Sequence, residues 1–206
     1  MIREWLISER NSGNRKYAII AFAGRGNSAQ TMVDIADDMN LTNTVSIGIE
    51  PNGMAWYPMP ISPFDQDEAV EGLPKARESC LDVIAQVQRM LQITKKQIVL
   101  MGFSAGGVMS AEVALHDPDD YAAVVIFCGT VLNHKAIPKA PLNNTPYMWI
   151  HCQDDECFKW HERYAPVKKR LLRSGYEPHF EFVEKNFGGH IVRRTDVALA
   201  RSEERR

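Results

Sequence analysis

The chain has 206 residues, of which 45% are hydrophobic, and its formal net charge is −2. This length fits one globular domain with a substantial core, and we expect that domain to span residues 1–206. A small negative charge without a basic stripe argues against a nucleic-acid partner. No segment approaches the roughly 18 apolar residues that a membrane span needs, and the charges within residues 1–5 do not suit a signal peptide, so we expect a cytoplasmic protein.

Strand-like and helix-like segments alternate along the chain. Short apolar segments predict six strands, at residues 17–22, 45–49, 97–103, 122–128, 146–151 and 179–183. Residues 69–91 and 159–174 carry apolar side chains at the three- and four-residue spacing of amphipathic helices, with Pro74 expected in the first turn of the former and Gly175 ending the latter. This alternation predicts an α/β fold, with a mostly parallel central sheet and helices on both faces.

The segment Gly-Phe-Ser-Ala-Gly-Gly at residues 102–107 lies between a predicted strand and a helix-like stretch. A sharp turn from strand to helix that exposes a serine is a nucleophile elbow. Such a turn needs small residues two positions before and two positions after the serine, as Gly102 and Gly106 provide. We therefore predict that Ser104 is a catalytic nucleophile.

A serine hydroxyl needs a histidine base and a carboxylate that orients it. In this type of fold the acid and then the histidine follow the serine along the chain. The predicted strand 146–151 leads into an acidic loop, and the last predicted strand leads into Gly188-Gly189-His190. We expect His190 to be the base and Asp155 the acid. Asp154 is the rival for the acid, because the sequence leaves one residue of register open.

Four segments together resemble the carboxylesterase and phospholipase family of α/β-hydrolases, which includes the acyl-protein thioesterases. They are residues 102–107, Ala-Trp-Tyr-Pro at 55–58, His-Cys-Gln-Asp-Asp at 151–155, and Gly189-His190. The similarity runs from about Tyr17 to His190. It implies an α/β-hydrolase fold without a separate lid domain, and hydrolysis of carboxylic ester or thioester bonds with no cofactor.

The resemblance also implies site residues. The family motif His-Gly-x-x-Asp places the acid four positions after the histidine, and counting from His151 gives Asp155. A second family motif, His-Gly-x-Gly, corresponds to residues 23–26, which implies an oxyanion hole formed by the backbone N–H groups of Arg25 and Ala105. The chain departs from these motifs at two positions, where Ala23 replaces the usual histidine and Cys152 the usual glycine.

The substrate is indicated only by class. Residues 51–64 are rich in proline, methionine and aromatic residues, and we expect Trp56, Tyr57 and Met59 to line an acyl pocket. The alternative is that these side chains only pack the loop onto the domain. Residues 130–144 would form the opposite wall, and a small or surface-presented ester or thioester is the expected substrate. The sequence leaves the oligomeric state open, including a homodimer.

Two other functions are compatible with the sequence. The first is a non-catalytic protein with this fold that binds a small ligand. The second is a metal-dependent hydrolase that holds zinc through His151, Cys152, Cys157 and His161, and that a chelator would inactivate. All four cysteines are otherwise expected to be free thiols.

Overall fold

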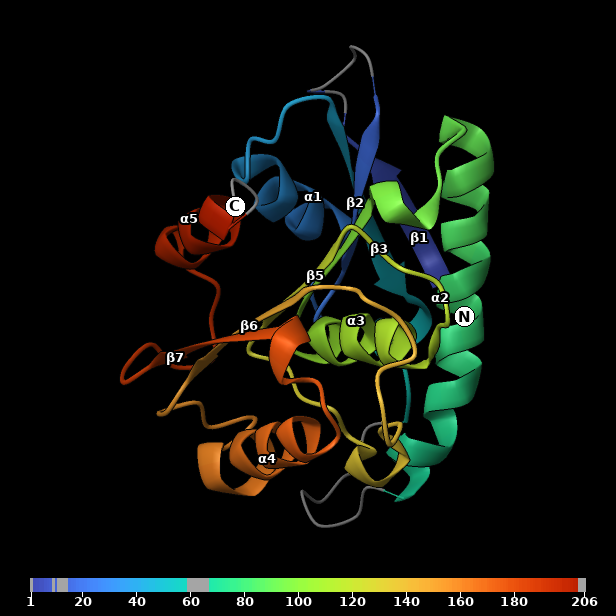
Figure 1. The fold of residues 1–206 in the computed structure, drawn as a ribbon. Helices are drawn as coiled ribbons and strands as arrows, with labels where there is room; N and C mark the ends of the chain where they lie inside the picture. Colours follow the sequence, from blue (N-terminus) through green and yellow to red (C-terminus); the bar gives the residue numbers. More distant parts are fainter. Residues whose placement is uncertain (1, 9, 11–14, 59–66, 204–206) are drawn as a thin grey trace.

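The computed structural model describes residues 2–8, 10, 15–58 and 67–203. Within these residues, seven strands form one sheet in the order β1-β3-β2-β4-β5-β6-β7 (Figure 1). Neighbouring strands from β3 to β7 run parallel, whereas β1 pairs with β3 in the antiparallel direction. The predicted α/β fold with a mostly parallel sheet is confirmed. The strands are β1 (Ile2–Ile7), β2 (Tyr17–Phe22), β3 (Thr44–Pro51), β4 (Ile98–Phe103), β5 (Ala123–Phe127), β6 (Tyr147–Cys152) and β7 (Phe180–Lys185).

Helices cover both faces of the sheet. They are α1 (Ala29–Asp38), α2 (Asp67–Leu91), α3 (Ala105–His116), α4 (Ala165–Arg173) and α5 (Arg194–Glu203), with a π-helical turn, Trp160–Tyr164, before α4. Figure 1 shows α1 and α5 on one side of the sheet and α2, α3 and α4 on the other. None of the described helices is long and apolar enough to span a membrane.

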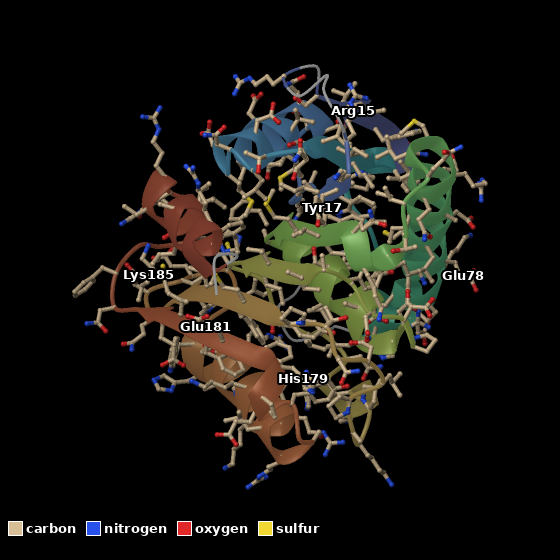
Figure 2. All side chains as sticks on the ribbon, turned by 45° about the horizontal axis from the view of Figure 1, so that its top comes forward. Arg15, Tyr17, Glu78, His179, Glu181 and Lys185 are labelled. Atoms are coloured by element: carbon tan, nitrogen blue, oxygen red, sulfur yellow. The ribbon has the colours of Figure 1, made fainter. Side chains whose placement is uncertain are left out.

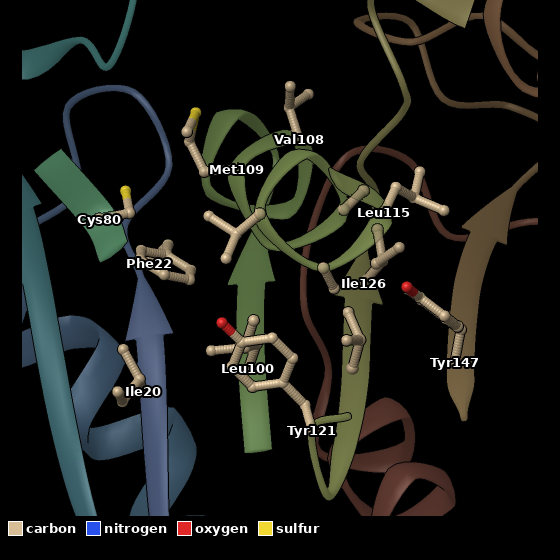
Figure 3. Close-up of a cluster of buried hydrophobic side chains, with 14 of the residues drawn as sticks. Ile20, Phe22, Cys80, Leu100, Val108, Met109, Leu115, Tyr121, Ile126 and Tyr147 are labelled. Atoms are coloured by element: carbon tan, nitrogen blue, oxygen red, sulfur yellow. The ribbon is translucent and has the colours of Figure 1, made fainter. Parts of the chain in front are cut away.

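Alternate residues of each strand face the two layers, because successive side chains of a strand point to opposite faces. From β2, Ile20 and Phe22 face α2 and α3, and Ile19 and Ala21 face α1 and α5. Figure 3 shows part of the first of these cores, where Ile20, Phe22, Leu100 and Ile126 of the strands lie below α3, which carries Val108, Met109 and Leu115. Burial of apolar surface on both faces makes the sheet a rigid support for the loops at its edges.

Three local expectations need correction. The sequence analysis did not predict strand β1, because the charged residues Arg3 and Glu4 interrupt the apolar pattern of this edge strand. Pro74 lies in the interior of α2 and not in its first turn, because the helix already begins at Asp67; the missing N–H removes one helical hydrogen bond there. The predicted helix 159–174 is divided into the π-helical turn and α4, and Gly175 follows it with φ 81°, as a C-terminal glycine does.

Parallel strands bring their carboxyl ends to one edge of the sheet, where ligands of open α/β sheets bind. The loops after β2, β4, β6 and β7 leave from this edge. Figure 2 labels His179 just before β7 and Lys185 at its far end, from which the chain continues to His190. The predicted site residues from four separate segments therefore start from a common edge.

Candidate active site

Ser104 stands in a strained turn between β4 and α3. Its φ of 55° and ψ of −119° are unusual for a residue with a side chain. The backbone N–H of Ser104 donates to the carbonyl oxygen of Phe127 at 2.9 Å, and its carbonyl accepts from the N–H of Val108 at 3.0 Å. Hydrogen bonds to β5 on one side and within α3 on the other hold the serine in this conformation.

The two glycines that flank the turn leave no room for a side chain. A Cβ atom on Gly106 would lie 1.9 Å from the carbonyl oxygen of Phe22, and one on Gly102 would lie 2.2 Å from the carbonyl oxygen of Gly106. Both distances are far below van der Waals contact. The elbow can therefore form against β2 only with glycine at these two positions, which is the physical basis of the sequence motif.

His190 links the serine to an acid. Its Nε2 lies 2.7 Å from Ser104 Oγ, and its Nδ1 lies 2.8 Å from Asp155 Oδ2. The side chain of Asp155 is fully buried, and that of His190 is 17% exposed. The rings of Phe103 and Phe158 lie 5.1 Å and 5.7 Å from the imidazole ring and limit its movement. The structure thus brings together the three side chains that the sequence analysis selected.

The second oxygen of Asp155 is held by its own loop. Oδ1 accepts the backbone N–H groups of Cys157 and Phe158, both at 2.8 Å. Burial alone would raise the pKa of Asp155, but the hydrogen bonds from His190 and the Phe158 N–H outweigh it and place the pKa below its usual value. The group is therefore a carboxylate at neutral pH, and it fixes the proton of His190 on Nδ1.

Asp154, the rival acid, has a different set of partners. Its carboxylate accepts the N–H groups of Gly189 at 2.8 Å and Gly188 at 3.1 Å, and these bonds lower its pKa. It therefore binds the backbone of the loop that carries His190, whereas Asp155 contacts the imidazole ring. The two adjacent carboxylates thus bind different groups: Asp154 binds the backbone of the loop, and Asp155 binds the imidazole ring of His190.

The loop after β2 lies directly beside the elbow. A Cβ atom on Gly24 would lie 3.1 Å from the carbonyl oxygen of Phe103, the residue that precedes Ser104. Arg25 follows in an exposed turn, and Ala105 is the first residue of α3. The first N–H groups of a helix have no carbonyl partner within that helix. Both backbone segments expected to donate to an oxyanion are thus close to Ser104.

Comparison with known proteins identifies the family. The sequence model of the phospholipase/carboxylesterase family matches residues 9–183. The chain belongs to the phospholipase/carboxylesterase family. The resemblance that the motifs indicated is confirmed, and membership indicates an esterase-type hydrolase. The match ends before His190, so the family model does not cover this residue.

Solved structures of esterases share the fold of this family member. Esterase PE8 has 16% identity over 97% of this chain and 96% of its own, with a TM-score of 0.85. A phospholipase/carboxylesterase from Dyadobacter fermentans has 17% identity over 97% and 94%, with a TM-score of 0.78. The Bacillus cereus carboxylesterase has 13% identity over 98% and 93%, with a TM-score of 0.78. At these identities the likeness concerns the fold.

Two of the residues expected to bind substrate are largely buried. Trp56 and Tyr57 are only 7% and 4% exposed. The indole N–H of Trp56 donates to the carbonyl oxygen of Ala23 at 2.7 Å, and its ring meets that of Phe22 edge-on. These contacts favour the alternative interpretation, in which the residues pack the loop onto the domain, and the acyl-pocket role stays a prediction. Met59 lies outside the described residues.

The predicted zinc ligands do not form one cluster. His151 is buried, its Nε2–H donates to the carbonyl oxygen of Phe158 at 2.9 Å, and its ring stacks on Tyr164. Cys157 is exposed. Within the described part of the chain, the metal-ligating atoms that lie within 4.8 Å of one another belong to a different group, namely Cys128, Asp155 and His190. Cys128 is buried, and its position directly after β5 puts it on the same edge of the sheet as Ser104.

Proposed function

We propose that this chain, acting as one domain, is a serine hydrolase that cleaves carboxylic ester or thioester bonds of a small or acyl-chain substrate. The observation that carries the proposal is the continuous contact from Ser104 Oγ through His190 to Asp155, with distances of 2.7 Å and 2.8 Å. A nucleophile, its base and an orienting carboxylate within hydrogen-bond reach are what acyl transfer requires.

In the first half of the reaction, Ser104 Oγ attacks the acyl carbon while His190 Nε2 takes its proton. The carboxylate of Asp155 stabilises the resulting imidazolium and stays ionised. When the tetrahedral intermediate collapses, His190 returns the proton to the leaving alkoxide or thiolate. The products are a free alcohol or thiol and an acyl group on Ser104.

In the second half, water attacks the acyl group and gives its proton to His190 Nε2. Collapse of the second intermediate returns this proton to Ser104 Oγ and releases the carboxylic acid. In each intermediate the oxyanion is stabilised by the N–H groups of Arg25 and Ala105, and each such donor contributes about 3 kcal/mol in known acyl-transfer enzymes. No cofactor takes part in these steps.

The rings of Phe103 and Phe158 suggest the class of substrate. They lie against the imidazole and make the surroundings of the reacting atoms apolar. An apolar environment strengthens the hydrogen bonds to the oxyanion and favours the aliphatic part of an acyl group over a charged one. We therefore propose an uncharged acyl group as the part of the substrate next to Ser104.

The test is labelling with a fluorophosphonate, which reacts with an activated serine. The parent protein should be modified stoichiometrically, with the modified peptide containing Ser104. Ser104→Ala should remain unlabelled, whereas Ser79→Ala, which removes a half-buried hydroxyl on α2 that donates to the carbonyl oxygen of Lys75, should react like the parent. A folded parent protein that does not react would contradict the proposal and favour a non-catalytic binding protein.

A further inference from the structure

Cys128 lies beside the pair formed by His190 and Asp155. It directly follows β5 with φ 48°, and it is buried. Its thiol donates to the carbonyl oxygen of Ile191 at 3.5 Å and, at 3.9 Å, to that of Gly189. The thiol therefore contacts the backbone on both sides of the histidine. The reaction described above makes no use of this group.

The three side chains present the ligand set of a zinc site. One atom each from Cys128, Asp155 and His190 lies within 4.8 Å of the other two. Thiolate, imidazole and carboxylate all bind Zn²⁺, at about 2.0 to 2.3 Å, and three protein ligands with an open fourth position are a common arrangement. Tetrahedral bonds of that length need ligand atoms about 3.5 Å apart. Side-chain rotations that shift these atoms by about 1 Å are enough to reach that spacing.

We propose that Cys128, Asp155 and His190 form an inhibitory site for Zn²⁺ and for related thiophilic divalent cations such as Cd²⁺. The ion enters past His190, whose side chain is the only one of the three exposed beyond a few per cent. It binds the thiolate of Cys128, an oxygen of Asp155, and Nδ1 of His190, which is the ring nitrogen that faces Asp155. Water takes the fourth position.

Zinc binding changes no oxidation state and only moves protons. The Cys128 thiol loses its proton to solvent as the Zn–S bond forms. The neutral imidazole keeps its proton but moves it from Nδ1 to Nε2, because Nδ1 now gives its lone pair to the metal. Nε2–H can no longer accept the proton of Ser104, so hydrolysis stops. The inhibition rests on the proposed serine mechanism, whereas the binding of the metal does not.

The first experiment is a titration of ester hydrolysis with ZnCl₂. We expect reversible inhibition of the parent protein that a chelator relieves. Cys128→Ser should need roughly tenfold or more Zn²⁺ for half-inhibition, and Cys157→Ser, which changes the exposed thiol, should need the same concentration as the parent. Equal sensitivity of Cys128→Ser and the parent would overturn the proposal.

A second measurement does not depend on activity. Cd²⁺ added to Ser104→Ala should produce the ultraviolet absorption of a Cd–thiolate bond, and Ser104→Ala combined with Cys128→Ser should lack it. If the band survives loss of Cys128 and disappears in Cys157→Ser, the site is wrong whatever the catalytic mechanism. If Ser104→Ala binds Cd²⁺ through Cys128 and the parent hydrolyses no ester, the metal site stands and the proposed hydrolase does not.

Discussion

The indole N–H of Trp56 donates a 2.7 Å hydrogen bond to the carbonyl oxygen of Ala23, across 33 positions of sequence. Ala23 is held from its other side by its N–H, which donates to the carbonyl oxygen of Ile49 at 3.0 Å. The loop that carries Arg25 is thus fixed at its first residue by both β3 and the segment that follows it. Trp56 is therefore a positioning residue for the proposed oxyanion hole.

Replacement of Trp56 by Phe keeps an aromatic ring beside Phe22 and removes only the donor. Loss of one hydrogen bond of about 1 kcal/mol predicts a roughly fivefold lower kcat with little change in KM. The affinity for a boronic acid, which mimics the tetrahedral intermediate, should fall in parallel. Steady-state kinetics and inhibitor titration measure both effects.

Tyr57→Phe is the matched control for Trp56→Phe. The hydroxyl of Tyr57 is buried and has no hydrogen-bond partner among the described residues. Its removal should leave kcat unchanged. A rise in KM alone for Trp56→Phe, or an equal loss of kcat in both variants, would mean that the two side chains act on substrate binding or on stability in general.

The two adjacent carboxylates should differ in their effect on catalysis. Asp155→Asn should lower kcat on the order of 10⁴-fold, as the equivalent change does in a serine protease, because the amide favours the wrong imidazole tautomer. Asp154→Asn keeps an oxygen that can accept from Gly188 or Gly189, so its loss should be much smaller. Comparison of kcat for the two variants on one ester checks this. The reverse ranking would assign the role of acid to Asp154.

The buried imidazole of His151 should make the fold sensitive to mild acid. Burial lowers its pKa below that of an unfolded histidine, and its Nδ1 has no hydrogen-bond partner among the described residues. A lowered folded-state pKa means that the unfolded chain binds the proton first. The stability contributed by neutral His151 is therefore complete above about pH 6.5 and is lost as the pH falls towards the folded-state value.

The melting temperature measured between about pH 7.5 and 5 tests this expectation. The parent should lose stability below pH 6.5, and His151→Gln, which keeps a donor for the carbonyl of Phe158 and has no titrating group, should lose less over the same range. Parallel curves for the two proteins would show that another group causes the acid sensitivity.

Much of this architecture can be predicted from local sequence. Buried parallel strands are continuous apolar runs, so β2, β4, β5 and β6 stand out, and β3 and the edge strand β7 keep an alternating apolar pattern; the edge strand β1 contains charged residues and does not stand out. The elbow can be predicted because backbone contact at Gly102 and Gly106 permits no other residue. The preference for Asp155 over Asp154 rests on the resemblance to the family motif, which puts the acid four positions after His151.

Contacts between distant segments were not predictable in the same way. The bond from Trp56 to Ala23 and the position of Cys128 beside His190 depend on how β2, β3 and β5 order themselves in the sheet. An aromatic residue in a proline-rich loop suggests a pocket lining as readily as a structural support. Only the direction of its indole N–H separates the two interpretations.

The kcat of Ser104→Ala on a short-chain p-nitrophenyl ester tests the central claim most directly. The substitution removes one oxygen from the elbow, so the melting temperature should stay close to that of the parent. Knockout of the nucleophile in a comparable triad costs on the order of 10⁶-fold in kcat, and we expect a loss of similar size here, with Ser79→Ala unaffected. A folded Ser104→Ala protein that keeps activity within about tenfold of the parent would contradict the assignment of Ser104 as the nucleophile.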